Sequence, residues 1–240
     1  VGVNWGTEKV GVRVSAYDTD WKDRNLTKSV QTGQGSSGDT DIIFLTGVNQ
    51  KHQGLELETK VKPTDKVELD FIASYGNWKF DGDADGTYQE QEYNDNNQVI
   101  GVTTTEYSYA LDGLYVGDMP QTSYILGLTY KPIKGLRLQA LYKTYDRNYA
   151  DWSPESREVE GDADRAQVWE APGYSKLDLH ASYKLPIKGY DISLNAHVFN
   201  ALDDVFVQDA VDNSKYNGYG DKLHLPHNAE VFLGTPRYAN

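Results

Sequence analysis

The stretch "LNAHVFNALDDVFVQDA", Leu194–Ala210, decides the fold that this sequence predicts. Its first part, Leu194–Val198, alternates apolar with polar residues, which is the period-two pattern of a β-strand with two different faces. The alternation stops at "NALDD", residues 200–204, a cluster of turn-forming residues. The pattern therefore indicates a strand that runs through one environment and leaves it near Phe199.

The same alternation recurs along most of the chain, and helical periodicity is nearly absent. The clearest examples are "KVGVRVSAY" (9–17), "GLELETKV" (54–61), "KVELDFIASY" (66–75), "GLRLQALYK" (135–143) and "KLDLHASYKL" (176–185). Such segments, separated by Gly, Pro and Asp clusters, are typical of an antiparallel sheet. The sequence therefore predicts an all-β fold.

The connections between these strands alternate between short and long. The short ones are "GTEK" (6–9), "KPTDK" (62–66), "KPIKG" (131–135) and "LPIKG" (185–189). The long ones are polar and cover about 22–44, 81–121, 150–173 and 205–228. In an antiparallel chain this places every long segment at one end of the sheet and the turns at Pro63, Pro132 and Pro186 at the other. A soluble β-sandwich also alternates, but long strands with one short and one long end are typical of outer-membrane barrels.

Composition limits the class of protein further. The 240 residues include 36 Asp and Glu against 23 Lys and Arg, giving a net charge of -13, which argues against a nucleic-acid surface. The chain has no Cys, so it offers neither disulfides nor thiolate metal ligands. It contains 18 Tyr and 6 Phe, and tyrosine suits a boundary between water and an apolar phase.

Several stretches resemble one known family. "VFNALDDVFVQDA" (198–210) resembles the penultimate-strand signature of TonB-dependent outer-membrane receptors, and "FLGTPRYAN" (232–240) resembles the approach to their last strand. "GLELETKVKPTDKVELDFIASY" (54–75) resembles the recurring strand–turn–strand unit of the family, and "YSKLDLHASYKL" (174–185) the strand before the signature. The two C-terminal motifs are the more specific ones.

This resemblance implies an antiparallel transmembrane β-barrel, seen in part. The family's barrels have about 22 strands around a plug, whereas about nine strands are visible here. We therefore expect residues 1–240 to be the C-terminal portion of the barrel domain, without the plug domain, and the long segments to be extracellular loops. Asn200, Asp203 and Asp204 would cap the backbone where the strand leaves the membrane.

The same resemblance implies a transport function. The chain would be part of an outer-membrane receptor of a Gram-negative bacterium that takes up a large scarce ligand, such as a siderophore or an oligosaccharide, with TonB supplying energy. It would not be an enzyme and would require no cofactor. Its partners would be the plug domain and remaining strands, the TonB complex, outer-membrane lipid and a surface lipoprotein, with no nucleic acid. The alternative is a secreted calcium-dependent carbohydrate-binding or adhesion β-domain.

Strict alternation also predicts which side chains share a face. The apolar set should face lipid and consists of Leu57, Leu69, Leu138, Leu179 and Leu194. The polar set should face the barrel lumen and consists of Glu58, Asp70, Arg137, Asp178 and Asn195. Leucines packed inside a closed sandwich would contradict the membrane interpretation.

Aromatic residues in the long segments are candidate ligand contacts. Rings of this kind could stack on sugars or on siderophore rings. The candidates are Tyr107, Tyr109, Tyr115, Tyr149, Trp152 and Trp169. The alternative for each of them is packing within the loops or in the aromatic girdle of a barrel.

One motif predicts a calcium site. "DGDADGTYQEQE" (81–92) fits the pattern D-x-D-x-D-G-x₅-E, in which oxygen ligands recur at alternate positions. The ligands would be Asp81, Asp83, Asp85, the carbonyl of Thr87, Gln89 through water, and Glu92. The flanks predict a strand and a loop, not the helix pair of such calcium sites. The alternative is an acidic, Gly-rich loop that binds nothing.

Overall fold

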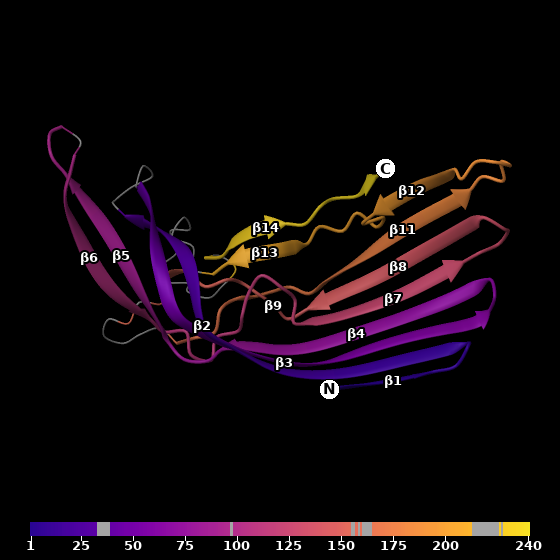
Figure 1. The fold of residues 1–240 in the computed structure, drawn as a ribbon, viewed down its shortest axis with the longest axis horizontal. Helices are drawn as coiled ribbons and strands as arrows, with labels where there is room; N and C mark the ends of the chain where they lie inside the picture. Colours follow the sequence, from indigo (N-terminus) through magenta and orange to yellow (C-terminus); the bar gives the residue numbers. More distant parts are fainter. Residues whose placement is uncertain are drawn as a thin grey trace.

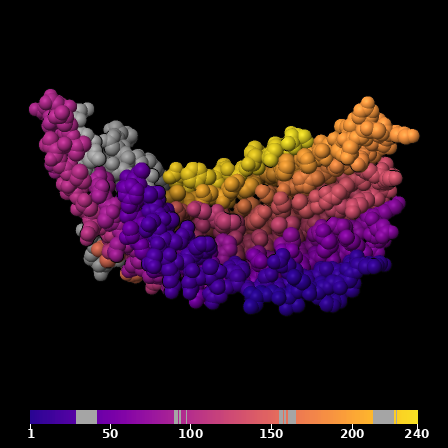
Figure 2. Space-filling view, in the orientation of Figure 1, coloured from indigo at the N-terminus to yellow at the C-terminus, as the bar shows by residue number. Residues whose placement is uncertain are grey.

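The structure is a computed structural model that describes residues 1–32, 39–96, 98–154, 157, 159, 165–212, 226 and 228–240. Its main element is an 11-stranded antiparallel sheet with strand order β1-β2-β3-β4-β7-β8-β11-β12-β15, to which the hairpin β5–β6 is added through β3. The chain crosses this sheet in sequence order from one edge to the other (Figures 1 and 2). The sheet is all-β and antiparallel, as predicted, and it is not closed.

The strands of the main sheet differ widely in length. The edge and wall strands are β1 (Gly2–Gly6), β2 (Val10–Thr32), β3 (Asp39–Thr64), β4 (Val67–Phe80), β7 (Thr122–Tyr130), β8 (Leu136–Asp146), β11 (Tyr174–Lys184), β12 (Ser193–Phe199) and β15 (Tyr238–Ala239). The added hairpin is β5 (Ala84–Tyr93) and β6 (Val99–Tyr109). Two small sheets pair β9 (Asn148–Tyr149) with β10 (Glu170–Ala171) and β13 (Val207–Val211) with β14 (Glu230–Leu233).

The register joins apolar residues into rows across the wall. One row runs without a break through Val10, Val61, Leu69, Leu128, Ala140, Leu179, Val198 and Ala239. Its large members are exposed; Leu128, for example, keeps 46% of its accessible surface. We call this side of the sheet the apolar face. The predicted apolar set lies on it, and no second layer formed by the described residues covers the wall (Figure 1).

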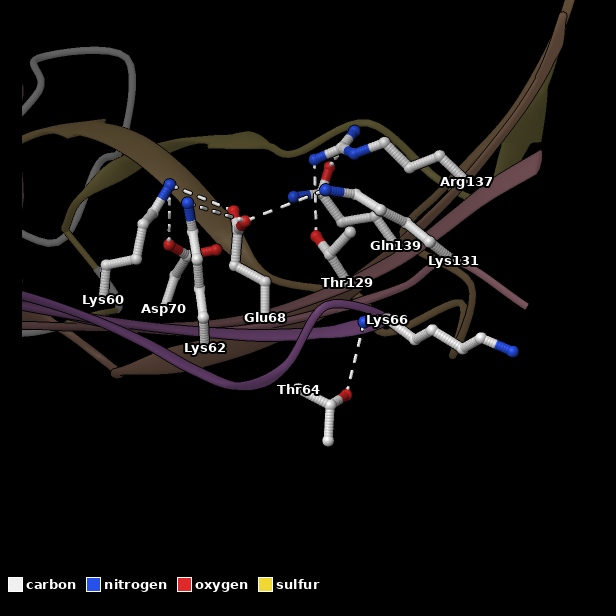
Figure 3. A network of polar contacts seen from close by, with 10 residues as sticks. All are labelled: Lys60, Lys62, Thr64, Lys66, Glu68, Asp70, Thr129, Lys131, Arg137 and Gln139. Carbon is white, nitrogen blue, oxygen red and sulfur yellow. Dashed lines mark hydrogen bonds and ion pairs between the residues drawn. The ribbon is translucent and has the colours of Figure 1, made fainter. Parts of the chain in front are cut away.

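The opposite side, which we call the polar face, carries the predicted polar set. A row there runs through Glu68, Thr129, Gln139, His180 and His197. Near the short turns, Figure 3 shows Glu68 surrounded by Lys60, Lys62 and Lys131 at 3.0, 3.9 and 4.0 Å. The two faces of one sheet are therefore matched to two different environments.

The turn at "NALDD" is held by its own asparagine. Asn200 is 3% exposed with φ 47°, in the left-handed region that Asn tolerates better than most residues. Its side-chain amide donates to the carbonyls of Asp204 and Thr235, and its backbone N–H donates to Asp178. The capping role predicted for Asn200 is confirmed by these contacts.

The two motifs of the C-terminal part meet at this turn. The Asp203 carboxylate accepts the backbone N–H of Arg237 at 2.9 Å and lies 3.4 Å from its guanidinium. "NALDD" and the "GTPR" stretch are thus one structural unit. The two motifs that carry the family resemblance therefore contact each other in the structure.

The short turns and the long segments lie at opposite ends of the sheet (Figure 1). The turns at Pro63, Pro132 and Pro186 join β3 to β4, β7 to β8, and β11 to β12. We call the end with the long segments the loop end. The predicted segments 22–44, 150–173 and 205–228 include residues 33–38, 160–164 and 213–225, among others, which lie outside the described residues.

Much of what the sequence predicts as loop is strand. β2 and β3 stay paired through segment 22–44 to the pair Thr32 and Asp39, and the hairpin β5–β6 occupies much of 81–121. Hydrophobic alternation does not mark these strands because exposed positions carry apolar residues too, such as Ile42 and Phe44 beside the buried Ile43 and Leu45. Cross-strand hydrogen bonds continue the pairing beyond the wall.

The loop end has a hydrophobic core of its own. The buried cluster consists of Ile43, Leu45, Val48, Phe80, Ala84, Tyr109, Leu111, Leu114, Tyr149, Trp152 and Val168. We call it the loop core. The part of the chain that the structure describes holds no helix with the length and hydropathy needed to cross a membrane.

Candidate functional site

A pocket of about 410 Å³ lies where the polar face meets the loop end. β2, β3 and β4 supply one side, and the segments after β6 and β9 supply the other. Its lining residues are Arg24, Leu26, Thr27, Lys28, Gln50, His52, Phe80, Val116, Gly117, Asp118, Asp151 and Trp152. The pocket therefore combines two cations, two carboxylates and three rings.

A polar chain and an aromatic stack form the strand side of the pocket. Gln50 accepts a hydrogen bond from Arg24 at 2.7 Å and lies 3.2 Å from the His52 ring. The His52 ring stacks on Trp78 with a centroid distance of 5.3 Å and an angle of 12°, and Trp21 meets it edge-on at 6.4 Å. Rings and polar groups thus alternate along this part of the polar face.

This aromatic stack continues toward the wall through Tyr17, whose hydroxyl accepts the indole N–H of Trp78 at 2.8 Å. The Tyr17 side chain lies directly over Gly54. A Cβ atom on residue 54 would lie only 2.3 Å from the hydroxyl oxygen of Tyr17. Glycine at this position therefore makes room for the ring. The result is a continuous aromatic strip from the wall to the pocket.

Lys28 links the strands to the opposite side of the pocket. Its ammonium group forms an ion pair with Asp151 and lies 4.9 Å from the centroid of the Trp152 ring. Asp151 is itself fixed by backbone hydrogen bonds to Ala210 and Asp212 at 2.8 Å each. The charge at this position is held by three segments that are far apart in the sequence.

Asp118 is a second carboxyl group in the pocket, and it titrates abnormally. Burial, followed by the negative charges of Asp151 and Asp209, raises the pKa of Asp118 to about 6. Its neighbour Gly117 passes so close to the backbone of Ala150 that a Cβ would lie 2.7 Å from the carbonyl carbon.

A buried ion pair holds the segments around the pocket together. Arg157 and Asp212 are 3.5 Å apart, with 0% and 1% of their side chains exposed. The Arg157 guanidinium also donates to the carbonyl of Ala166 at 2.6 Å, and its own backbone carbonyl accepts the N–H of Ala110. Through its side chain and its backbone, Arg157 therefore joins three of the long segments.

The predicted aromatic contacts are mostly gathered in or against the loop core. Tyr109, Tyr149 and Trp152 are buried, with 2%, 7% and 2% exposed. Tyr107 stacks on Tyr109, and Tyr115 stacks on Tyr149 at 4.1 Å. Trp169 is partly exposed, and its carbonyl accepts the N–H of Ala150. Trp152 also lines the pocket. A ligand-binding role for these six residues stays a prediction.

The calcium motif does not converge on one point. From Ala84 to Tyr93 it forms β5, paired residue by residue with β6. Because side chains alternate along a strand, Asp85, Thr87 and Gln89 share one face and Glu92 lies on the other. Asp81 and Asp83 precede the strand. A calcium ion bound by the whole motif would require β5 to leave its partner.

Asp83 forms an ion pair with Arg165. Both of its oxygens accept hydrogen bonds from Arg165, at 3.0 and 2.7 Å. Arg165, followed by the backbone N–H groups of Asp112 and Leu111, holds the pKa of Asp83 below its usual value. Among the described residues, no group of three or more His, Cys, Asp or Glu side chains is placed to hold a metal ion. The calcium site stays a prediction.

The sequence did not single out the strand side of the pocket. The predicted ligand contacts all lie in the long segments. The strand side of the pocket instead uses residues within or just beyond predicted strands, namely Tyr17, Trp21, His52 and Trp78. A signal was available in the alternation itself. Tyr17 follows Arg13 and Ser15 in the polar phase of its strand, and an aromatic ring in that phase faces away from the apolar side.

The arrangement is suited to reversible binding. Donors, acceptors, charges of both signs and ring faces surround a pocket that is open to the polar face, which are the elements of a small-molecule site. A polar ligand with flat or ring-shaped parts would find partners for both its edges and its faces.

Comparison with known proteins agrees with this architecture. A family model described as "TonB dependent receptor-like, beta-barrel" matches residues 1–201. A solved structure named "Copper transporter OprC" is similar with a TM-score of 0.56 and 16% identity, over 99% of this chain and 29% of that chain, which is a likeness of fold.

A second solved structure, named "CymD monoaromatic hydrocarbon channel", matches with a TM-score of 0.44 and 14% identity, over 82% of this chain and 57% of that chain. No curated protein sequence matches. The chain thus spans about three tenths of the length of the copper transporter and somewhat over half of that of the channel.

Proposed function

The chain belongs to the TonB-dependent receptor-like β-barrel family, and from this premise we propose that it is part of the barrel wall of an outer-membrane active-transport receptor. The receptor takes up a large scarce ligand, and TonB supplies the energy. The family match over residues 1–201 is the observation that carries the proposal. The proposal assigns binding and conformational steps to the protein and no covalent chemistry.

The two faces of the sheet support this proposal. A lipid bilayer is the environment in which the exposed apolar row would be buried, and antiparallel strands with one apolar face are the form in which a sheet spans a membrane. In this proposal the apolar face contacts outer-membrane lipid and the polar face lines the lumen. The loop end is extracellular, and the short turns are periplasmic.

The partners follow from the same proposal. The remaining strands complete the barrel, a plug domain occupies its lumen, and the TonB complex acts from the periplasmic side. A surface lipoprotein would dock on the loop end. The pocket lined by His52, Lys28 and Asp151 lies on the lumen side of the loop end, where a ligand would enter.

Fractionation and uptake measurements test the proposal in the complete protein. We expect it in the outer-membrane fraction, and we expect growth on its scarce nutrient to require both the protein and TonB. The variant Trp78→Leu removes the stacking partner of His52 and should weaken uptake without moving the protein from the membrane. Recovery of the protein from the soluble or secreted fraction would contradict the proposal and support the secreted β-domain instead.

Calcium binding is a separate question that the motif raises. If residues 81–92 hold an ion, calorimetric titration should give binding heat that is lost in an Asp83→Ala, Glu92→Ala variant. An extracellular site of this class binds at roughly 10⁻⁴–10⁻³ M. The absence of heat up to several times that range would rule the site out.

A further inference from the structure

Two histidines on the polar face form a pair across neighbouring strands. His180 of β11 and His197 of β12 are register partners, and both rings are partly exposed on this face. Their Nδ1 atoms are 2.7 Å apart. At this distance one ring donates its Nδ1–H to the Nδ1 lone pair of the other, so one proton lies between the two nitrogens.

We propose that His180 and His197 bind a divalent transition-metal ion through their Nδ1 atoms. The metal takes the place of the shared proton, and water or a bound solute completes its coordination. Imidazole nitrogen is a good ligand for Zn²⁺, Ni²⁺ and Cu²⁺. This inference rests on the geometry of the pair and is independent of the proposed transport function.

The spacing of the two nitrogens indicates which metals fit. With metal–nitrogen bonds of about 2.05 Å, two ligands at the 90° angle of a square-planar site are about 2.9 Å apart, and at a tetrahedral angle about 3.3 Å. The observed 2.7 Å is a hydrogen-bond distance and is shorter than either value, so the two nitrogens must separate slightly to hold a metal. Square-planar and tetragonal sites of nitrogen and oxygen are those of Cu²⁺ and Ni²⁺, whereas structural Zn²⁺ is tetrahedral. Because nitrogen sites in general bind Cu²⁺ more tightly than Zn²⁺, the pair should prefer Cu²⁺ to Zn²⁺.

Neighbouring rings hold the two imidazoles in place. Phe199 contacts both of them, at centroid distances of 5.5 Å to His180 and 6.0 Å to His197. Phe199 is in turn stacked on Tyr238, with a distance of 4.7 Å between the ring centroids. With the backbone register fixing the Cα atoms as well, little conformational freedom is left to lose when a metal binds.

Electron paramagnetic resonance of the complete protein with one equivalent of Cu²⁺ tests the proposal directly. A copper ion held by both imidazoles gives a tetragonal spectrum with splittings from two equivalent nitrogens. Binding to the neutral pair should release no net proton, because the donor ring carries its proton on Nε2 instead of Nδ1 once Nδ1 holds the metal. A spectrum with one nitrogen or none, in the protein with native His180 and His197, would overturn the proposal.

Single substitutions locate the ion. His180→Gln and His197→Gln should each lower Cu²⁺ affinity by roughly 100-fold, since even loss of a supporting outer-shell partner costs 10–100-fold. His52→Gln is the matched control, because His52 also lies on the polar face and should leave the spectrum unchanged. Heat-dependent migration on gels checks that each variant retains its barrel. An unchanged affinity in a folded His180→Gln variant, or equal affinity for Zn²⁺ and Cu²⁺, would contradict the proposed site.

Discussion

The wall and the loop end of this molecule handle apolar side chains in opposite ways. In the wall, apolar residues such as Leu126 and Leu194 are 55% and 58% exposed. At the loop end, Leu45, Leu111 and Leu114 are at most 1% exposed and pack into the loop core. One continuous sheet thus contains a region without a protein core and a region that folds around one.

The difference shows where each region obtains its stability. The wall has ladder hydrogen bonds and an exposed apolar surface, so in the proposed receptor its stability depends on the membrane. The loop end buries its own apolar surface and adds a buried ion pair, as a water-soluble domain would. If this contrast is correct, mutations in the two regions should respond differently to the surrounding medium.

The largest effect should come from breaking the buried ion pair. Arg157→Ala leaves Asp212 buried without its cation, which should cost about 3–5 kcal/mol of stability at the loop end. Hydrogen exchange should rise in β9, β10 and β13 and stay unchanged in β7, β8 and β11. The double variant Arg157→Met, Asp212→Leu should recover most of the loss. Equal loss of protection in wall and loop end would show that they unfold as one unit.

Leucine truncation compares the two apolar environments directly. Leu111→Ala leaves a cavity in the loop core and should cost about 2–5 kcal/mol. Leu126→Ala on the apolar face should cost about 1 kcal/mol or less in lipid, because acyl chains fill the space. Denaturant unfolding in lipid vesicles measures both. Similar losses at the two sites would contradict the assignment of the apolar face to lipid.

Charge on the wall provides the converse test. Leu128→Arg places a cation in the middle of the apolar row and should cost roughly 2–4 kcal/mol in a bilayer. Gln139→Arg is the control, because Gln139 is on the polar face next in register to Thr129. The two variants should differ in vesicle insertion yield, and equal yields would argue against opposite environments on the two faces.

The smallest effect should be a pH dependence confined to the loop end. The pKa of Asp118 is raised from 3.8 to about 6, so its contribution to stability is fully present below about pH 4 and is lost as the pH rises through about 6. Hydrogen exchange around Gly117 and Ala150 should therefore speed up across this range, with β8 unaffected. Asp118→Asn, which tolerates the φ of 70°, should remove the dependence. A response that persists in this variant would assign it to another group.

The wall could be predicted from the sequence because its two environments impose a period of two. Alternation placed Leu69 and Asp70 on opposite faces, and the structure agrees. The strands of the loop end escaped prediction for the same reason. From Ile42 to Leu45, apolar residues occupy exposed and buried positions alike, so no apolar period marks this part of the pairing.

The pocket was beyond prediction in a different way. It depends on contacts between residues far apart in the chain, such as Lys28 with Asp151. A lysine in a polar segment carries no local sign of its partner. The bond of Asn200 to Asp204 is the opposite case, because it is local and follows from residue type and from the end of the alternation.

The hydrogen bonds of Asn200 should also influence the order in which β12 and β15 pair during folding. The registered pairs of β12 and β15, Val198 with Ala239 and Phe199 with Tyr238, lie directly beside the bonds of Asn200 to Thr235 and of Asp203 to Arg237. Those bonds bring the two segments together in one alignment before any further pair can form. Pairing should then proceed like a zipper from this point toward the short turns. A slip of one residue, which would turn every side chain of β15 to the wrong side, is thereby prevented at the first step of assembly.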